Sequence, residues 1–343
     1  MRWRLVWFER WADPIAETIL GEHPEIERVR LRLSDPPEVV WKALEGAHGY
    51  QWPRPPYLGD AELIRRCPNL LAMASQGSGC DVMNFPACNE AGVMIVNQAG
   101  LGGREAVASH AFGMMIALSK QLVQCDRAMR RDRNWERLQF VGEDLRGKTV
   151  GIVGLGNIGS RLAEMCRELF AMEVLAYDPY VDEAGIAARG ARKVGFDALL
   201  RESDFVSVHC PLTDETRGMI DARAFSLMRP GAYYVVTARG GITDEAALVA
   251  ALRERRIAGA GVDVWDEEPP PLDHPLLGLD NVVVSCHIAG VTRQGYRSTA
   301  EAAALQWITI FEGKRPPRLV NPEVWPRYRE RFARIAGRAP VDP

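Results

Sequence analysis

Residues 148–179 constrain the fold of this chain more than any other stretch. Residues 149–153 form a continuous run of mainly apolar residues, which is typical of a strand buried on both faces. Three glycines and a helical pattern follow, and residues 173–177 form a second buried strand. Strand, glycine turn, helix and strand in this order predict a βαβ unit, from which parallel sheets are built.

The three glycines have different predicted tasks. Gly154 allows a tight turn after the strand, Gly156 lets a phosphate approach the backbone, and Gly159 lets the helix pack closely on the strand. The helix begins beyond Asn157, so the free N–H groups of its first turn face the glycine turn and can bind phosphate. One side of this helix is predicted to be apolar, with Ile158, Leu162, Met165, Cys166 and Leu169.

An acidic residue, Asp178, follows the second strand. A carboxylate at this position can accept hydrogen bonds from both ribose hydroxyls of an adenosine, and it would repel a 2′-phosphate. Pro179 comes next, and no arginine stands beside the acid. The unit therefore predicts the binding of a dinucleotide cofactor, with NAD favoured over NADP.

Length and composition limit what else the chain can be. Its 343 residues suggest two domains of ordinary size, each large enough to bury a core. The chain is 47% apolar and 25% charged, and its net charge of -3 offers no general attraction to nucleic acid or anionic lipid. The first residues do not form a signal-peptide core, and no apolar run approaches ~18 residues. We therefore expect a cytoplasmic protein with neither a nucleic-acid partner nor a membrane.

The seven cysteines are scattered along the chain and are never spaced as CxxC. This distribution argues against a disulfide framework and against a zinc site. We expect no bound metal.

Residues 1–102 alternate between strand-like and helix-like segments, which predicts a smaller α/β unit. The segments are residues 4–8, 38–43, 70–75 and 93–97. Between them, residues 50–57 are interpreted as a proline-rich loop with aromatic residues, among them Tyr50 and Trp52. This loop is either a stiff surface loop or a wall of the substrate pocket.

A helical pattern runs from residue 104 to about residue 131, with apolar residues at helical spacing. We predict one long helix that serves as a domain hinge and a subunit contact. His110 lies within it and is interpreted as a packing residue rather than a ligand.

Strand-like runs recur beyond the glycine turn, and helical patterns lie between them near residues 196–203 and 244–254. The runs are residues 204–208, 232–237, 259–264 and 282–285. This alternation predicts a doubly wound parallel sheet, whose ligands bind at the carboxyl ends of its strands. The last three of these strands are followed closely by Arg239, Glu268 and His287.

These three residues have the chemistry of an oxidoreductase site. The planar guanidinium of Arg239 suits a carboxylate and an adjacent carbonyl oxygen. His287 is a natural proton donor near neutral pH, and Glu268 beside it would orient the ring. Taken singly, each residue is more readily interpreted as a surface or core group, but together at one sheet edge they favour catalysis. The predicted reaction reduces a 2-keto acid to a 2-hydroxy acid.

The chain resembles the D-isomer-specific 2-hydroxyacid dehydrogenases over about residues 67–322. The resemblance is densest in LRGKTVGIVGLGNIGSRLA, HCPLTDETRGMI, TARGGITDEAAL, GAGVDVWDEEP and CHIAGVT. It implies a Rossmann NAD domain at residues 103–290. It also implies a smaller, discontinuous flavodoxin-like substrate domain, made of residues 1–102 and 291–343, and a homodimer.

The resemblance assigns substrate binding to Arg239, the acid partner to Glu268 and proton transfer to His287. It makes Ser78 and Gly79, in a turn after an apolar strand, the backbone clamp on the substrate carboxylate. It also implies contacts with the pyrophosphate, the adenine and the nicotinamide of the cofactor. The residues concerned are Asn157, Ile158, His209, Cys210, Pro211, Thr237, Ala238 and Gly290.

Two residues carry more specific expectations from the resemblance. Asp263 would accept a hydrogen bond from the nicotinamide carboxamide. Trp135 would either reach the active site of a partner subunit or pack in the subunit interface. The chain also departs from the family pattern at Ser109, Val236 and Cys286, where glutamate, asparagine and proline are usual. These departures weaken any transfer of substrate identity from a relative.

The sequence thus predicts an NAD-dependent D-2-hydroxyacid dehydrogenase that works as a 2-keto acid reductase. The hypothesised substrate is an apolar or aromatic keto acid. A competing interpretation is an NAD(H)-sensing binding protein of the corepressor type on the same fold, which would bind cofactor without turnover. An enzyme of this fold acting on phosphite also stays open, whereas the glutamate and histidine argue against formate.

Overall fold

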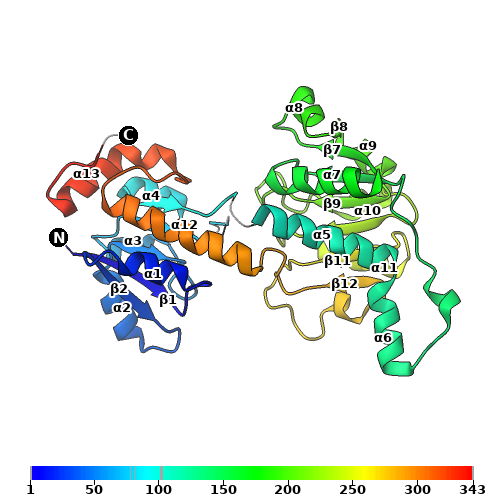
Figure 1. The fold of residues 1–343 in the computed structure, drawn as a ribbon, viewed down its shortest axis with the longest axis horizontal. Coiled ribbons are helices and arrows are strands. Elements are labelled where there is room, and N and C mark those ends of the chain that lie inside the picture. The colour runs from blue at the N-terminus through cyan, green and yellow to red at the C-terminus, as the bar shows by residue number, and fades with distance from the viewer. Residues whose placement is uncertain (1, 78, 81, 101–102, 342–343) are drawn as a thin grey trace. The chain divides into compact units, whose positions relative to one another are not determined.

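The computed structural model describes residues 2–77, 79–80, 82–100 and 103–341. The chain divides into two compact units (Figure 1). The first unit is Met1–Gly102 with Thr292–Pro343, and the second unit is Gly103–Val291. Each unit holds one sheet whose named strands all pair in parallel. The predicted α/β class with a doubly wound parallel sheet is confirmed.

The second unit holds the glycine turn and a seven-stranded sheet. Its strands are β6 (Thr149–Val153), β7 (Glu173–Tyr177), β8 (Arg192–Lys193), β9 (Phe205–Val208), β10 (Tyr233–Val236), β11 (Gly259–Val262) and β12 (Val282–Val284). Their order in the sheet is β12-β11-β10-β9-β6-β7-β8. Counted from β6, this is the order of a dinucleotide-binding sheet, in which the winding reverses between β6 and β9. Ligands of such sheets bind at the carboxyl ends of the strands on either side of that reversal.

Helices cover both faces of this sheet (Figure 1). On one face lie α5 (Gly103–Ser119), α7 (Asn157–Phe170) and α8 (Glu183–Ala188). On the other face lie α9 (Phe196–Glu202), α10 (Ala222–Leu227) and α11 (Glu245–Arg253). Because both faces are covered, β9 and β11 are buried at every residue, as continuous apolar runs predict.

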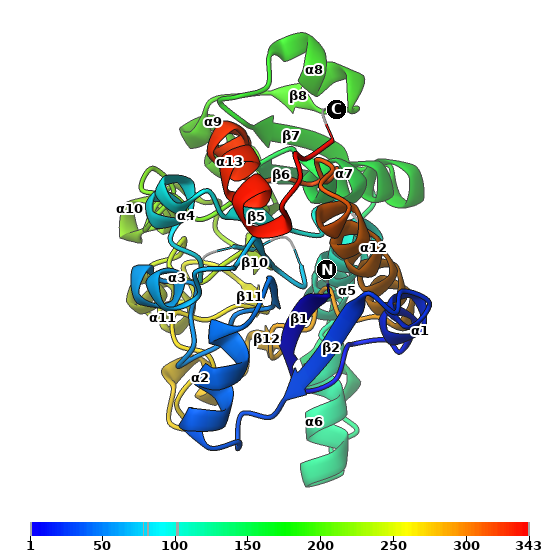
Figure 2. The same ribbon diagram turned by 90° about the vertical axis from the view of Figure 1, so that its left-hand side faces the viewer.

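The first unit has a five-stranded sheet in the order β2-β1-β3-β4-β5, which is the flavodoxin-like order. Its strands are β1 (Trp3–Phe8), β2 (Ile26–Leu31), β3 (Gly49–Gln51), β4 (Ala72–Ala74) and β5 (Met94–Val96). One face is covered by α1 (Ile15–Gly21), α12 (Arg293–Phe311) and α13 (Trp325–Ala336). The other face is covered by α2 (Pro37–Glu45), α3 (Ala61–Arg66) and α4 (Phe85–Ala91). Figure 2 shows this unit facing the viewer.

The single helix predicted for residues 104 to about 131 is wrong, because two helices occupy this stretch. α5 ends at Ser119, and α6 (Leu122–Asp132) leaves at an angle of 61°. Gln121 between them has a positive φ of 51°. The backbone N–H of Glu143 donates to the carbonyl of Ser119 (2.8 Å), so a returning segment takes the place of the next helical turn.

No single helix in the described part of the chain has both the length and the apolar character needed to cross a membrane. Among the described residues, one bent pair of helices, α5 and α6, reaches that length and composition when the two are taken together.

The apolar side of α7 is shorter than predicted. Leu162, Met165 and Cys166 are buried, but Leu169 is 64% exposed. Leu169 lies on the same side of the helix, so burial along α7 ends before its last turn.

Candidate active site

The parallel register aligns the ends of six strands along one edge of the second sheet. Tyr177, Val153, Val208, Val236, Val262 and Val284 are partners in successive strands. The residues that directly follow them are Asp178, Gly154, His209, Thr237, Asp263 and Ser285. Polar residues that are far apart in the sequence therefore meet in one row at the carboxyl edge.

The glycine turn leaves room for a ligand at one glycine and none at the other two. Gly154 has a positive φ of 90°, and a Cβ there would lie 2.7 Å from the backbone nitrogen of Cys210. A Cβ at Gly159 would lie 2.2 Å from the carbonyl oxygen of Gly154. A Cβ at Gly156 would meet nothing within 4 Å, and no side chain caps α7 there. The open backbone at the start of α7 suits a phosphate.

Two buried polar atoms in the row have no hydrogen-bond partner among the described residues. They are Oγ1 of Thr237 and Nδ1 of His209. Burial lowers the pKa of His209 to about 4, so the ring is neutral near pH 7. A buried hydroxyl without a partner fits a site that a polar part of a cofactor completes. The residues present therefore fit a dinucleotide.

Asp178 holds the glycine turn at the end of β7. Its carboxylate accepts hydrogen bonds from the backbone N–H groups of Leu155 and Tyr180, both at 3.0 Å. The sequence analysis missed a cation at this turn. The guanidinium of Arg189 donates to the carbonyl of the same Leu155. Arg189 lies at the end of α8, well beyond Asp178 in the sequence, so no local pattern indicates this proximity.

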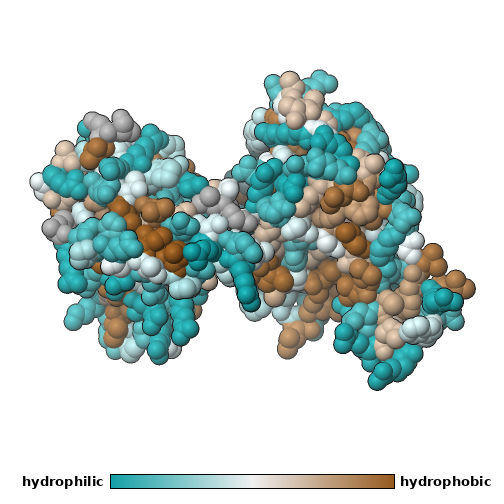
Figure 3. Space-filling view, in the orientation of Figure 1, coloured by the Kyte–Doolittle hydropathy of each residue, from teal (hydrophilic) through white to brown (hydrophobic). Residues whose placement is uncertain are grey.

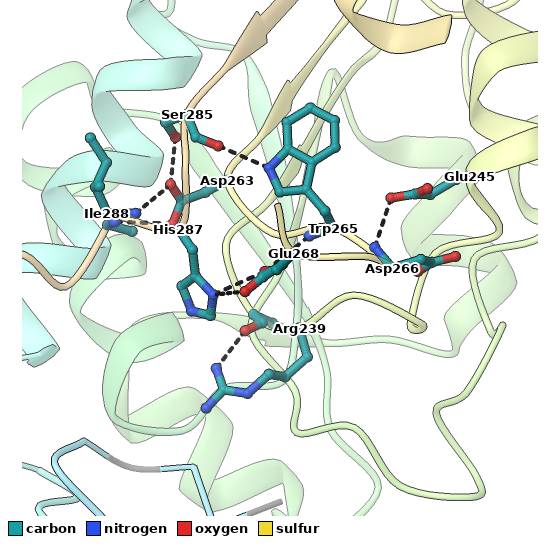
Figure 4. Close-up of polar contacts among 11 residues, drawn as sticks. Arg239, Glu245, Asp263, Trp265, Asp266, Glu268, Ser285, His287 and Ile288 are labelled. Atoms are coloured by element: carbon teal, nitrogen blue, oxygen red, sulfur yellow. Dashed lines mark hydrogen bonds and ion pairs between the residues drawn. The ribbon is translucent and has the colours of Figure 1, made fainter. Parts of the chain in front are cut away.

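His287 and Glu268 come together beyond β12 and β11. Nδ1 of His287 lies 2.8 Å and 3.0 Å from the two carboxylate oxygens of Glu268 (Figure 4). Both side chains are about 40% exposed, at 42% and 40%. The hydrogen bond fixes the ring through Nδ1 and leaves Nε2 available for a proton transfer. The sequence had suggested this pair, and the structure brings the two residues into contact.

Arg239 follows β10, in a loop that is tied to the loop of Glu268. The backbone N–H of Gly241 donates to the carboxylate of Asp266 (2.5 Å). A Cβ at Gly240 would lie 2.0 Å from the carbonyl oxygen of Trp265, so the two loops touch. Nη1 of Arg239 donates to the carbonyl of Ala238 (2.7 Å), and Figure 4 shows the guanidinium in the same region as His287.

Asp263, which directly follows β11, has a fully buried side chain. The contact with a nicotinamide carboxamide that the resemblance implied stays a prediction. The two carboxylate oxygens accept hydrogen bonds from the backbone of Ile288 (2.9 Å) and Ala289 (3.0 Å). The carboxylate is therefore used inside the protein, because it holds the loop that carries His287.

The remaining predicted cofactor residues of the second unit lie around the same edge. Asn157 and Ile158 open α7. Pro211 is exposed, and Cys210 and Gly290 are half-buried. Ala238 is buried next to Thr237. A Cβ at Gly290 would lie 3.7 Å from the nearest atom, in Val107 of α5. Their contacts with a cofactor stay predictions.

The predicted substrate residues of the first unit differ in how far they are buried. Tyr50 belongs to β3 and not to a loop; it is 0% exposed, and its hydroxyl donates to the carbonyl of Tyr57 (2.9 Å). It is a core residue, which does not fit a pocket wall. Trp52 is half-buried, and the guanidinium of Arg54 lies 3.4 Å from its ring centroid. Gly79 is half-buried, whereas Ser78 lies outside the described residues.

Comparison with protein families and curated proteins points to one family. The model of the D-isomer specific 2-hydroxyacid dehydrogenase, NAD binding domain, matches residues 112–289. The D-3-phosphoglycerate dehydrogenase of Archaeoglobus fulgidus is 40% identical over 268 residues, which are 78% of this chain and 50% of that protein. The glyoxylate reductase of Thermofilum pendens is 37% identical over 271 residues, 77% of this chain and 79% of that protein. The chain thus spans about half the length of the phosphoglycerate dehydrogenase it matches.

Solved structures resemble both the fold and the sequence. The TT0316 protein from Thermus thermophilus has a TM-score of 0.82 and 30% identity, over 92% of this chain and 99% of that one. Holo D-mandelate dehydrogenase from Rhodotorula graminis has a TM-score of 0.83 and 25% identity, over 93% of this chain and 97% of that one. The glycine turn, the strand order and these matches agree: the chain belongs to the D-isomer-specific 2-hydroxyacid dehydrogenase family, and its second unit is the NAD-binding domain of that family.

Proposed function

We propose that this protein transfers hydride between NAD(H) and a D-2-hydroxy acid/2-keto acid pair, and that it works as a 2-keto acid reductase. The observation that carries the proposal is the hydrogen bond between Nδ1 of His287 and Glu268 at the carboxyl edge of the NAD-binding sheet. Membership of the family supports the same reaction class. The alternative of an NAD(H)-sensing binding protein gains no support from the relatives named above.

The proposed roles follow from the chemistry of the side chains. The bound nicotinamide supplies the hydride. Glu268 accepts a hydrogen bond from the Nδ1–H group of His287, and the Nε2–H group of the imidazolium gives its proton to the carbonyl oxygen of the keto acid. Arg239 binds the substrate carboxylate through its planar fork of donors. Trp52 and the carboxylate clamp of Ser78 and Gly79, all residues of the first unit, stay proposed substrate-binding residues.

Replacing the proposed proton donor should stop turnover without weakening cofactor binding. We expect His287→Asn to lower kcat for 2-keto acid reduction by roughly 10²–10⁴-fold, the usual contribution of a general acid. NADH affinity, measured by fluorescence titration, should stay near the wild-type value, because His287 is not assigned to the cofactor. The rate is measured by following the loss of NADH absorbance.

His23 is a suitable control, because it forms another His–Glu pair at the surface of the first unit, with Glu25 at 3.0 Å. We expect His23→Asn to keep wild-type turnover. Retained turnover in His287→Asn would mean that the proton comes from another group. If the wild-type protein binds NADH but turns over no keto acid, the result would instead favour the NAD(H)-sensing binding protein.

The choice of NAD over NADP is proposed to depend on the charge of Asp178. We expect Asp178→Ala to weaken NADH binding and to raise the NADPH/NADH ratio of kcat/KM by at least about tenfold, or about 1.4 kcal/mol. Removing the carboxylate removes its repulsion of a 2′-phosphate, and Arg189 on Leu155 can then attract that phosphate.

Asp178→Asn removes the negative charge but keeps the hydrogen bond to the glycine turn, because an amide oxygen can still accept from the backbone N–H of Leu155. It should relax the cofactor preference with a smaller loss of NADH affinity. Asp182→Ala, which removes the N-cap of α8 on the same side of the sheet, is the matched control. An unchanged cofactor ratio in both Asp178 variants would contradict this assignment.

An apolar or aromatic 2-keto acid is the proposed substrate. Trp52, half-buried under the guanidinium of Arg54, supports this choice, although Tyr50 no longer does. D-mandelate dehydrogenase, a structural relative, is named for an aromatic 2-hydroxy acid. We expect kcat/KM for phenylpyruvate to exceed that for glyoxylate and for phosphohydroxypyruvate by about tenfold or more, a typical selectivity for apolar pockets.

Trp52→Ala should reduce this preference. Trp41 in the same unit is also stacked by an arginine, with Arg66 at 3.5 Å, so Trp41→Ala is the matched control. A large advantage of glyoxylate or phosphohydroxypyruvate over phenylpyruvate in the wild type would overturn the aromatic preference and leave the reaction class intact.

A homodimer is proposed from the exposed apolar residues on the segment that follows α6. Trp135, Leu138 and Val141 are 75%, 83% and 67% exposed. In Figure 3 this segment, at the lower right, carries brown hydrophobic surface next to teal hydrophilic surface. Such a group of large apolar side chains is suited to burial against a second copy of the chain.

We expect the wild type to have the mass of a dimer in light scattering after gel filtration, and Trp135→Ser/Leu138→Ser to shift it toward a monomer. The double variant removes apolar area from the proposed contact. Leu272→Ser, at a residue 99% exposed in a different loop, should leave the dimer unchanged. A monomeric wild type at micromolar concentration would refute the homodimer.

A further inference from the structure

One residue binds three consecutive backbone N–H groups of the loop that carries His287. The carbonyl oxygen of Asp263 accepts from His287 (2.8 Å), and its carboxylate accepts from Ile288 (2.9 Å) and Ala289 (3.0 Å). Asp263 itself is 0% exposed. The position of the loop therefore depends on the orientation of a buried carboxylate.

The loop needs this support because of its backbone conformation. His287 has a positive φ of 55°, a region that residues with a side chain rarely adopt. Such a residue keeps its conformation only where the surroundings hold it. In this conformation the ring reaches Glu268, so the support from Asp263 bears directly on the proposed proton donor.

The carboxylate of Asp263 is hydrogen-bonded to the hydroxyl of Ser285, which is in turn hydrogen-bonded to the imidazole of His110. Oγ of Ser285 donates to Oδ1 of Asp263 (Figure 4). Nε2 of His110 lies 3.0 Å from the same hydroxyl. Since a hydroxyl carries one hydrogen and Ser285 gives it to the carboxylate, Nε2 of His110 must be the donor to Ser285. The chain of hydrogen bonds thus runs from His110 through Ser285 to Asp263.

The members of this chain come from elements that are themselves fixed. His110 lies on α5, which packs on the sheet, and Ser285 directly follows β12. The indole N–H of Trp265 donates to the carbonyl of Ser285 (3.0 Å). The backbone N–H of Trp265 donates to Glu268 (3.2 Å), so the same region also orients the partner of His287.

We propose that His110 and Ser285 are positioning residues for His287 and act through the carboxylate of Asp263. This inference rests on the proposed function, because it assigns these residues to the support of the proposed proton donor. It replaces the interpretation of His110 as a packing residue. His110 orients the Ser285 hydroxyl, the hydroxyl orients the carboxylate, and the carboxylate holds residues 287–289 in place.

The test compares variants that break the chain with variants that preserve it. His110→Phe and Ser285→Ala remove a donor, whereas His110→Gln and Ser285→Thr retain one. We expect the first pair to lower kcat by roughly 10–100-fold, the order of effect of a misplaced catalytic group. NADH affinity should stay near wild type even where the melting temperature falls, because Ser285→Ala leaves the buried carboxylate of Asp263 short of one donor. The second pair should recover most of kcat.

A double variant tests whether the two residues act in one chain. If they do, His110→Phe/Ser285→Ala should be no slower than the slower single variant, because the second change removes nothing further. Wild-type kcat in His110→Phe, or a loss that His110→Gln does not recover, would overturn the proposal and return His110 to packing.

Hydrogen–deuterium exchange separates this proposal from the proposed function. The amides of residues 287–289 should exchange slowly in the wild type and faster in His110→Phe and Ser285→Ala, because their acceptors become mobile. This measurement needs no substrate. Unchanged exchange in both variants would refute the positioning role, whereas an absence of keto acid turnover in the wild type would refute only the reaction.

Discussion

The parallel pairing of the seven strands is the constraint on which the rest of the second unit depends. In a parallel sheet all the carboxyl ends fall on one edge, so the residue after each strand is brought to that edge whatever its distance in the sequence. Here the last residues of β6, β9, β10 and β11 are partners in the sheet, so the residues that follow them, Gly154, His209, Thr237 and Asp263, lie side by side. The site is thus a consequence of backbone hydrogen bonding before any side chain makes a contact.

The sequence predicts this edge well, because a strand covered on both faces must be an apolar run and the first polar residue marks its end. The limits predicted for β6 and β7 match those of the structure. The runs predicted at residues 232–237, 259–264 and 282–285 each extend one or two residues beyond the ends of β10, β11 and β12. The glycine turn is equally readable, since close approach to Cys210 and to Gly154 leaves no room for a side chain at Gly154 or Gly159. Constraints of this kind act over a few residues and leave a local signature.

What the sequence could not predict depends on distant contacts. Tyr50 lies in a three-residue strand next to prolines, and only its neighbours in the sheet make it a core residue. The helix predicted beyond residue 104 breaks at Ser119 because a segment more than twenty residues later returns to its end. Arg189 reaches Leu155 across the gap between a helix end and the glycine turn. Each case needs a partner that no local pattern identifies.

The direction in which a polar side chain faces is the hardest property to infer. Asp263 and Glu268 follow the same strand and carry the same functional group, yet one is fully buried and the other is 40% exposed. The difference lies in the available donors: the backbone of residues 287–289 surrounds Asp263, and the ring of His287 meets Glu268. Because a buried carboxylate is costly unless it is fully hydrogen-bonded, the donors around Asp263 commit it to structural support. The exposed carboxylate of Glu268 is left to orient the ring of the proposed proton donor. Of two acids that follow the same strand, the one that the backbone N–H groups of the next loop surround supports the structure, and the other is left exposed for the proposed reaction.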